Sequence, residues 1–156
     1  MATVEASVEV AAPLAEVWEL YFDRDRWAAW VDGYAAPAGV SGGYPEQGGK
    51  LRWRSTPAGR GEVSERVIVH EPRSLHRIAF EDTATEGELE TRFEIRPADE
   101  GRMTCVAQAL TYRLRKGGPL APVTDLLFIR SQQRRSLQRS LIELRLEAER
   151  TGAAPV

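Results

Sequence analysis

Few side chains in this sequence combine the types and the spacing that acid–base, nucleophilic or metal chemistry requires. His70 and His76 flank a predicted turn at Pro72, with Glu71 between them. Because a turn end is rich in solvent and no further ligand lies nearby in the sequence, we expect no metal site there. We interpret His76 as a surface histidine, with a role as general base as the less favoured alternative.

The lone cysteine and the glycine pairs suggest no further chemistry. Cys105 cannot form an internal disulfide and has apolar neighbours in a predicted strand, so we expect an inert, buried thiol. Gly42-Gly43 and Gly48-Gly49 lack the Lys-Ser/Thr ending and the following helix of a phosphate-binding loop. The sequence therefore predicts no metal and no cofactor, and it identifies no catalytic residue.

The long helix predicted over residues 120–149 has an unusual buried face. Six apolar positions form one stripe at helical spacing: Val123, Leu126, Leu137, Leu141, Leu144 and Ala148. Between the two ends of this apolar stripe lie Arg130, Gln133 and Arg134. Unpaired buried charge is costly, so either these residues line a cavity, or the helix bends or rolls and both arginines reach solvent. We predict that Arg130 and Arg134 face a pocket beside the long helix.

Other candidates for the wall of such a pocket lie on the predicted strands and turns. Glu65 shares a strand face with three valines, so it either points inward to pair with Arg130 or Arg134, or is exposed by a local twist. Trp30 and Trp53 flank the glycine-rich segment 33–49 that could gate a cavity. The predicted ligand-binding set is therefore Trp30, Trp53, Glu65, Phe93, Arg130, Gln133 and Arg134.

The elements that must position these residues follow from hydrophobic periodicity. Alternation predicts strands over residues 4–10, 50–55, 62–70, 75–81, 88–96 and 103–114, with a weaker strand within 33–49. Helical spacing predicts a short helix after Pro13 and a second short helix or turn over residues 23–30. Short turns between consecutive strands favour an antiparallel meander, and hence an α+β fold.

Length, composition and charge set broad limits. The chain has 156 residues, and we expect one domain over residues 1–150 with a flexible tail over 151–156. The net charge is −2, which gives no general attraction to nucleic acid. No run of apolar residues is long enough to span a membrane, and the first residues do not resemble a secretory signal, so we expect a cytoplasmic location.

Three features together resemble the START-like (SRPBCC) superfamily. Residues 8–18, which read VEVAAPLAEVW, match the superfamily's strand, small residue and proline, and helix bearing Val-Trp. Trp30 matches a later tryptophan, and the turn EPRSL at residues 71–75 resembles the usual link between middle strands. The resemblance, nearest to bacterial polyketide cyclase/dehydrase-like proteins, implies a helix-grip fold. In that fold a seven-stranded curved antiparallel sheet wraps around the C-terminal helix and encloses a pocket for hydrophobic ligands.

Three functions remain open from the sequence. The chain binds a hydrophobic small molecule, lipid-like or polycyclic, in an internal cavity; or it is a cofactor-independent polyketide cyclase, aromatase or dehydratase; or it is a protein-interaction module. The absence of a recognisable acid–base set favours binding without catalysis. We expect a small-molecule partner and no nucleic acid, with a homodimer as a possibility.

Overall fold

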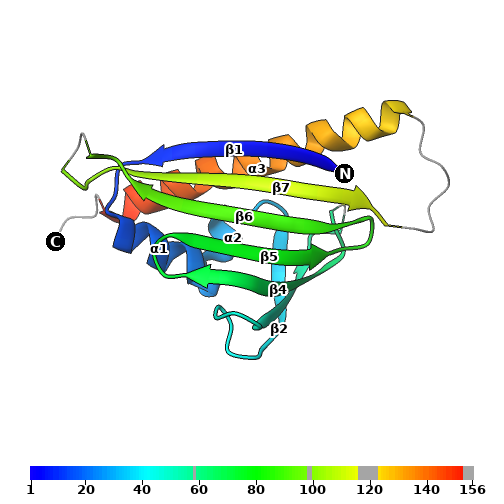
Figure 1. Ribbon diagram of the computed structural model, residues 1–156, viewed down its shortest axis with the longest axis horizontal. Coiled ribbons are helices and arrows are strands. Elements are labelled where there is room, and N and C mark those ends of the chain that lie inside the picture. The colour runs from blue at the N-terminus through cyan, green and yellow to red at the C-terminus, as the bar shows by residue number, and fades with distance from the viewer. Residues whose placement is uncertain (58, 98–99, 116–122, 153–156) are drawn as a thin grey trace.

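The computed structural model describes residues 1–57, 59–97, 100–115 and 123–152, and within the last range the side chains of residues 127–150. These residues form one sheet, a long C-terminal helix and two short helices that follow the first strand (Figure 1). The predicted α+β, helix-grip architecture is confirmed. The predicted tail and the stripe positions Val123 and Leu126 lie outside the described side chains.

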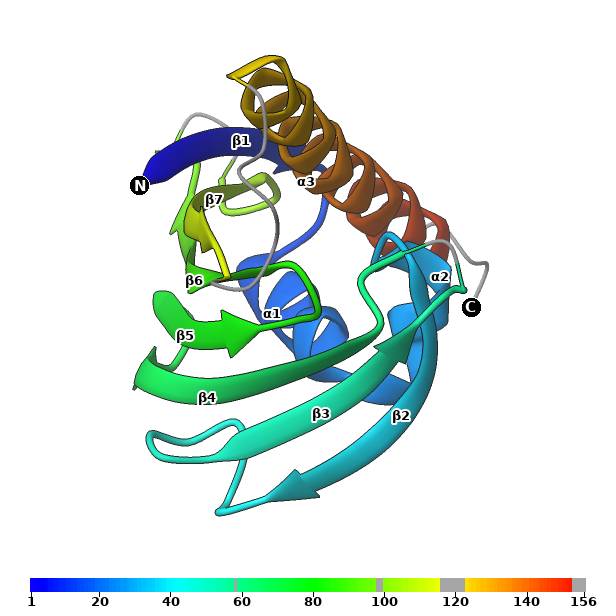
Figure 2. The same cartoon turned by 90° about the vertical axis from the view of Figure 1, so that its right-hand side faces the viewer.

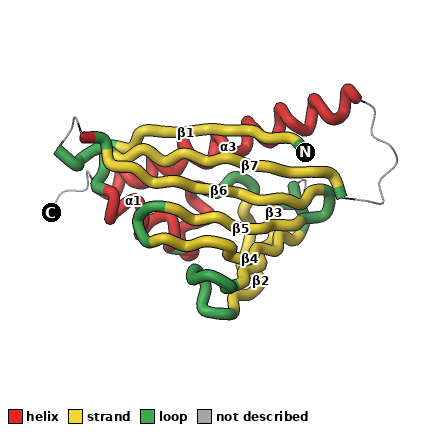
Figure 3. The backbone as a smooth tube through the Cα atoms, in the orientation of Figure 1, coloured by secondary structure: helices red, strands yellow, loops and turns green. Residues whose placement is uncertain are grey.

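The seven strands pair only with antiparallel neighbours, in the order β1-β7-β6-β5-β4-β3-β2. Their bounds are β1 Ala2–Val10, β2 Tyr34–Ser41, β3 Lys50–Ser55, β4 Glu62–Glu71, β5 Leu75–Glu81, β6 Thr85–Ile95 and β7 Thr104–Leu114. All connections from β2 to β7 run between sheet neighbours, as the short turns predicted, while β1 closes the sheet by pairing with β7. The sheet curves strongly around the helices, which all lie on its concave side (Figures 2 and 3).

The structure corrects one strand boundary. We predicted a turn over residues 82–87, but β6 begins at Thr85 and Gly87 pairs with Tyr112 in β7. A Cβ atom at Gly87 would lie 2.0 Å from the Thr111 carbonyl oxygen, so only glycine allows this close approach of two strands. The glycine that suggested a turn is therefore required inside a strand.

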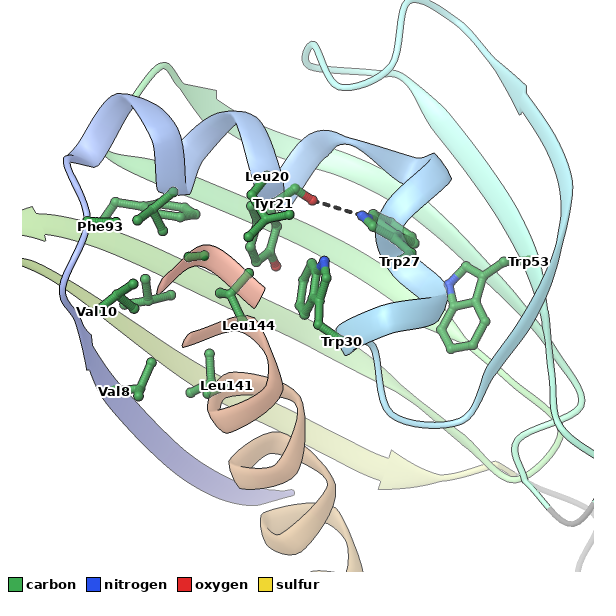
Figure 4. Close-up of a cluster of buried hydrophobic side chains, with 14 of the residues drawn as sticks. Val8, Val10, Leu20, Tyr21, Trp27, Trp30, Trp53, Phe93, Leu141 and Leu144 are labelled. Atoms are coloured by element: carbon green, nitrogen blue, oxygen red, sulfur yellow. Dashed lines mark hydrogen bonds between the residues drawn. The ribbon is translucent and has the colours of Figure 1, made fainter. Parts of the chain in front are cut away.

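The helices are α1 Leu14–Phe22, α2 Trp27–Trp30 and α3 Val123–Gly152, with a 3-10 turn over Arg24–Arg26 between the first two. Val17, Leu20 and Tyr21 form the buried face of α1. The Trp27 indole N–H donates to the Tyr21 carbonyl oxygen at 2.8 Å, and this bond ties α2 to the end of α1 (Figure 4).

Polar contacts fix the register of α3 against the rest of the molecule. The Asp32 backbone N–H donates to the Ser140 hydroxyl at 2.9 Å, and the Ser136 hydroxyl donates to the Asp32 carboxylate at 2.8 Å. Nearer the C-terminus, Arg26 and Glu147 form an ion pair at 2.7 Å. None of the described helices is long and apolar enough to cross a bilayer.

The core has two parts. The larger packs α1, α2 and the C-terminal half of α3 against the sheet, and includes Val10, Trp27, Trp30, Leu141 and Leu144 (Figure 4). The second part covers the middle of the sheet and includes the following residues: Val4, Val67, Ile78, Phe80, Leu110, Tyr112 and Leu137. Tyr44 packs against both parts.

Candidate functional site

A hollow of about 90 Å³ lies between the concave face of the sheet, α2 and α3. Its walls are mainly aromatic and aliphatic, with a few polar groups. The lining residues used below are Tyr21, Trp30, Tyr44, Trp53, Arg60, Glu65, His76, Ile78, Leu89, Gln108, Leu110 and Gln133. Apolar walls with a few polar groups are typical of sites for small molecules.

One row of polar side chains crosses the inner face of the sheet. Strand pairing places His76 opposite Thr91, and Thr91 opposite Gln108. All three residues are buried. The next row in the same strands is apolar and consists of Ile78, Leu89 and Leu110. On these three strands a polar row is therefore followed by an apolar one.

Tyr21 of α1 joins this polar row. The Tyr21 and Thr91 hydroxyls are hydrogen-bonded at 2.9 Å, and the Gln108 amide N–H donates to both hydroxyl oxygens, at 3.2 Å and 3.1 Å. Burial raises the pKa of Tyr21 to about 12, so the phenol keeps its proton at neutral pH. The network thus consists of neutral donors and acceptors.

Two residues that line the hollow each have a buried polar atom without a hydrogen bond to any described residue. The amide oxygen of Gln108 and the indole N–H of Trp30 are buried and have no hydrogen-bond partner within the described part of the chain. A buried polar group without a partner costs about 1–3 kcal/mol. A bound water or the polar group of a ligand that reaches these atoms would recover that free energy.

Glu65 points inward, as one of our two interpretations predicted, but its predicted pairing with Arg130 or Arg134 is wrong. The Trp53 indole N–H donates to a Glu65 carboxylate oxygen at 2.7 Å. Burial raises the pKa of Glu65, while the Trp53 hydrogen bond and the charge of Arg60 oppose the shift. Glu65 is therefore a carboxyl group held in an apolar wall, where its ionised form is disfavoured.

His76 is not the surface residue that we predicted. Only 3% of it is exposed, and it lines the hollow. Its ring nitrogen Nδ1 lies 3.0 Å from Nδ1 of His70, the residue directly opposite in β4. Burial, with a smaller contribution from His70, lowers the pKa of His76 to about 3, so the ring is neutral at pH 7. The hairpin end faces α1, whose aromatic side chains exclude the solvent that we expected there.

A wider groove of about 630 Å³ adjoins the hollow and shares Asp32, Arg60, Gln133 and Ser136 with it. Arg60 forms an ion pair with Asp82 at 2.6 Å, and its guanidinium lies over the rings of Trp53 and Phe80. Burial alone would raise the pKa of Asp82, but Arg60 and the backbone N–H groups of Thr85 and Ala84 together lower it. The shared residues mark where the hollow meets the outer groove.

Four of the seven predicted ligand-binding residues line the hollow: Trp30, Trp53, Glu65 and Gln133. Phe93 is buried in the core instead, against the rings of Trp18 and Tyr21. Arg130 and Arg134 are exposed and do not line the hollow, so the prediction that they face it is wrong. The alternative interpretation holds, because the helix turns both arginines toward solvent, and Arg130 reaches the Thr3 carbonyl oxygen at 3.4 Å.

Sequence reasoning missed Tyr21, Thr91 and Gln108, and it favoured a surface position for His76. A signal was present, since β5, β6 and β7 each have a polar residue among the apolar residues of the inward face: His76, Thr91 and Gln108. The strand register, which aligns the three, was needed to see them as one row.

The structure also shows the surroundings of Cys105 and of a serine in a Gly-x-Ser-x-Gly pattern. Cys105 is buried, as predicted. A Gly-x-Ser-x-Gly pattern occurs over residues 39–43, but Ser41 is exposed at the end of β2 and a turn follows instead of a helix. It is therefore not the nucleophile elbow of a hydrolase.

Among the described residues, no cluster of three or more His, Cys, Asp or Glu side chains could hold a metal ion.

Comparison with known proteins places the chain in a family. Residues 1–149 match the family described as "Polyketide cyclase / dehydrase and lipid transport", and the chain belongs to it. A search of curated proteins gave no significant match.

Solved structures share the fold. The Zhui aromatase/cyclase from Streptomyces sp. R1128 is 22% identical, with a TM-score of 0.74 over 98% of this chain and 96% of that one. The protein XoxI from Bacillus cereus is 14% identical, with a TM-score of 0.72 over 99% and 100% of the two chains. A START superfamily protein from Mycobacterium smegmatis is 14% identical, with a TM-score of 0.69 over 96% and 98%. At these identities the likeness establishes the fold, and the family supports a role in hydrophobic ligand binding or cyclisation.

Proposed function

We propose that the chain binds an apolar small molecule, lipid-like or polycyclic, that carries a hydroxyl or carbonyl group. The observation that carries this proposal is the mainly apolar hollow with a buried, unpaired amide oxygen at Gln108 in its wall. Ligand hydrocarbon would pack against Ile78, Leu89 and Leu110. A ligand hydroxyl would pair with the Gln108 amide oxygen, and a ligand carbonyl with the Trp30 indole N–H.

The size of the hollow limits how the ligand sits. Sites for drug-sized ligands usually measure roughly 300–1,000 Å³. The hollow has about 90 Å³, whereas the adjoining outer groove has about 630 Å³. The ligand therefore places a small apolar part in the hollow and extends past Arg60 and Gln133 into the outer groove.

A matched pair of bicyclic probes tests this proposal. 2-Naphthol and naphthalene differ by one hydroxyl group, and binding of either would quench tryptophan emission because Trp30 and Trp53 line the hollow. We expect 2-naphthol to bind with micromolar affinity, about −8 kcal/mol, and about tenfold more tightly than naphthalene because it satisfies the buried amide.

A variant and a control isolate the polar contact. Gln108→Met keeps the volume and removes the amide, so it should weaken 2-naphthol binding about tenfold and leave naphthalene binding unchanged. Gln138→Met, at an exposed position of α3, should change neither. If neither compound binds the unaltered protein, or if Gln108→Met affects both equally, the proposed polar recognition is wrong.

A second candidate function is a cofactor-independent cyclase or dehydratase, and one observation favours it specifically. His76 and Glu65 are ionisable groups in the wall of the hollow, on neighbouring strands, where burial favours the neutral form of each. A neutral imidazole can accept a proton, and the raised pKa of the Glu65 carboxyl favours the form that can donate one; these are the two roles that enolisation and dehydration require.

A further inference from the structure

His70 and His76 form a direct contact between their rings. They are opposite residues of the β4–β5 hairpin, and their Nδ1 atoms lie 3.0 Å apart. This distance is that of a hydrogen bond, so one Nδ1 carries a proton and the other offers its lone pair. When both rings are neutral, the two histidines must therefore be in opposite tautomers.

The two rings connect different environments. His76 is buried and lines the hollow, whereas His70 is half-buried next to the hairpin turn. In an imidazole ring Nε2 lies on the side away from Nδ1, and among the residues that the structure describes the hydrogen bond of the His76 ring is the Nδ1 contact with His70. A proton can thus enter the pair at His76 from the hollow and leave it at His70.

We propose that His70 and His76 form a proton relay that lets His76 act as a base toward a carbonyl compound in the hollow. This inference rests on the proposed binding function and adds a reaction to it. His76 Nε2 takes a proton from the carbon next to the ligand carbonyl, the electron pair of that C–H bond forms the C=C bond of the enolate, and the π pair of the C=O bond moves to the oxygen. The Nδ1 proton of His76 passes to Nδ1 of His70, which releases its own Nε2 proton to water.

The surroundings explain why a relay is needed. Both rings are enclosed mainly by uncharged aromatic groups from α1 and the segment 42–49: Trp18, Phe22, Tyr21 and Tyr44. The charged group that acts on the pair is Glu46, beside His70. Burial makes a cation on His76 unfavourable. By passing its second proton on, His76 accepts a proton from the ligand without keeping the charge.

Deuterium exchange measures the proposed step. 1-Tetralone is a bicyclic ketone whose hydrogens next to the carbonyl exchange slowly in neutral D₂O, and mass spectrometry follows the exchange. We expect the protein to accelerate this exchange, and His76→Asn to abolish the acceleration. His70→Asn should reduce it at least tenfold, as part of the roughly 10²–10⁴-fold acceleration typical of acid–base catalysis. Asparagine can replace the Nδ1 hydrogen bond of His70, but it cannot relay a proton.

Controls separate this inference from the binding proposal. The affinity for 1-tetralone is measured for each variant by tryptophan quenching, and Glu71→Gln, an exposed neighbour in the same turn, should leave the exchange unchanged. If 1-tetralone binds and His70→Asn retains the full exchange rate, or if the unaltered protein accelerates nothing, the relay is wrong. Absence of any 1-tetralone or naphthol binding would instead contradict the binding proposal.

The tautomers give an independent readout that needs no ligand. Long-range ¹H–¹⁵N spectra at pH 7 should show two neutral rings, one protonated at Nδ1 and the other at Nε2. Two rings that both carry their proton on Nε2 would leave no proton between the Nδ1 atoms and would overturn the relay.

Discussion

The two halves of α3 meet different surroundings. In the C-terminal half, Leu137, Leu141, Leu144 and Ala148 are all buried against the sheet and the short helices. In the described part of the N-terminal half, Leu127 and Phe128 are 64% and 60% exposed, and Arg130 and Arg134 are exposed as well. That end of the helix rises past the edge strand β1 (Figures 1 and 2).

The difference shows what an interrupted stripe means here. Arg130 and Arg134 lie on the solvent side of the helix and not in the wall of the hollow, while the neighbouring Ile129 packs against the second part of the core. The hollow lies where the two halves meet, and of the three polar residues in the interruption only Gln133 lines it.

The largest effect expected from this comparison is on the free energy of unfolding, when one leucine in each half is replaced. Leu144 is completely buried, so Leu144→Ala should lower the free energy of unfolding by about 2–5 kcal/mol through lost contacts and a cavity. Leu127→Ala, at an exposed position, should change it by no more than about 0.5 kcal/mol. Urea denaturation measures both. Comparable losses would mean that the two halves are equally packed.

The next effect concerns the polar row beside the hollow. The pKa of His76 is lowered to about 3 by burial, whereas an unfolded chain has about 6.5. The unfolded chain therefore binds a proton more readily, and stability is lost as pH falls from about 6.5 toward 3. At pH 5 the loss should be about 2 kcal/mol, at about 1.4 kcal/mol per pH unit below 6.5.

His76→Asn removes this titration, so subtracting its stability curve from that of the unaltered protein isolates the histidine. The two curves should run parallel above pH 7 and separate below pH 6.5, with the variant less sensitive to acid. Curves that stay parallel down to pH 4 would show that His76 is not held neutral in the folded protein.

The fold could be predicted in detail because its signals are local. Alternation set the strands, Pro13 and the Val17-Trp18 spacing set α1, and short turns set the antiparallel order, all of which the structure confirms. The exception, Gly87, depended on the distance to Thr111 in another strand, and no local pattern contains that distance.

The site could be predicted only in part, because it depends on the register of the strands and on the rotation and path of α3. Trp30, Trp53, Glu65 and Gln133 were found from their own surroundings in the sequence. His76, Thr91 and Gln108 lie side by side because of the register of three strands. A single polar residue in each strand does not predict that they are neighbours. The exposure of Arg130 and Arg134 depends on the rotation and path of α3, which an ideal wheel does not contain.

The smallest expected effect is a difference in 2-naphthol affinity between variants at two adjacent residues of α3. Gln133 lines the hollow and the outer groove, while Arg134 is exposed and lines neither. Gln133→Ala should therefore change 2-naphthol affinity severalfold, because it widens the passage between hollow and groove and removes one polar contact. Arg134→Ala should leave 2-naphthol affinity within twofold and the free energy of unfolding within about 0.5 kcal/mol, as expected for an exposed side chain. Fluorescence titration and urea denaturation test both variants. If Arg134→Ala loses more 2-naphthol affinity than Gln133→Ala, then Arg134 contacts the ligand and its assignment to the solvent face of α3 is wrong.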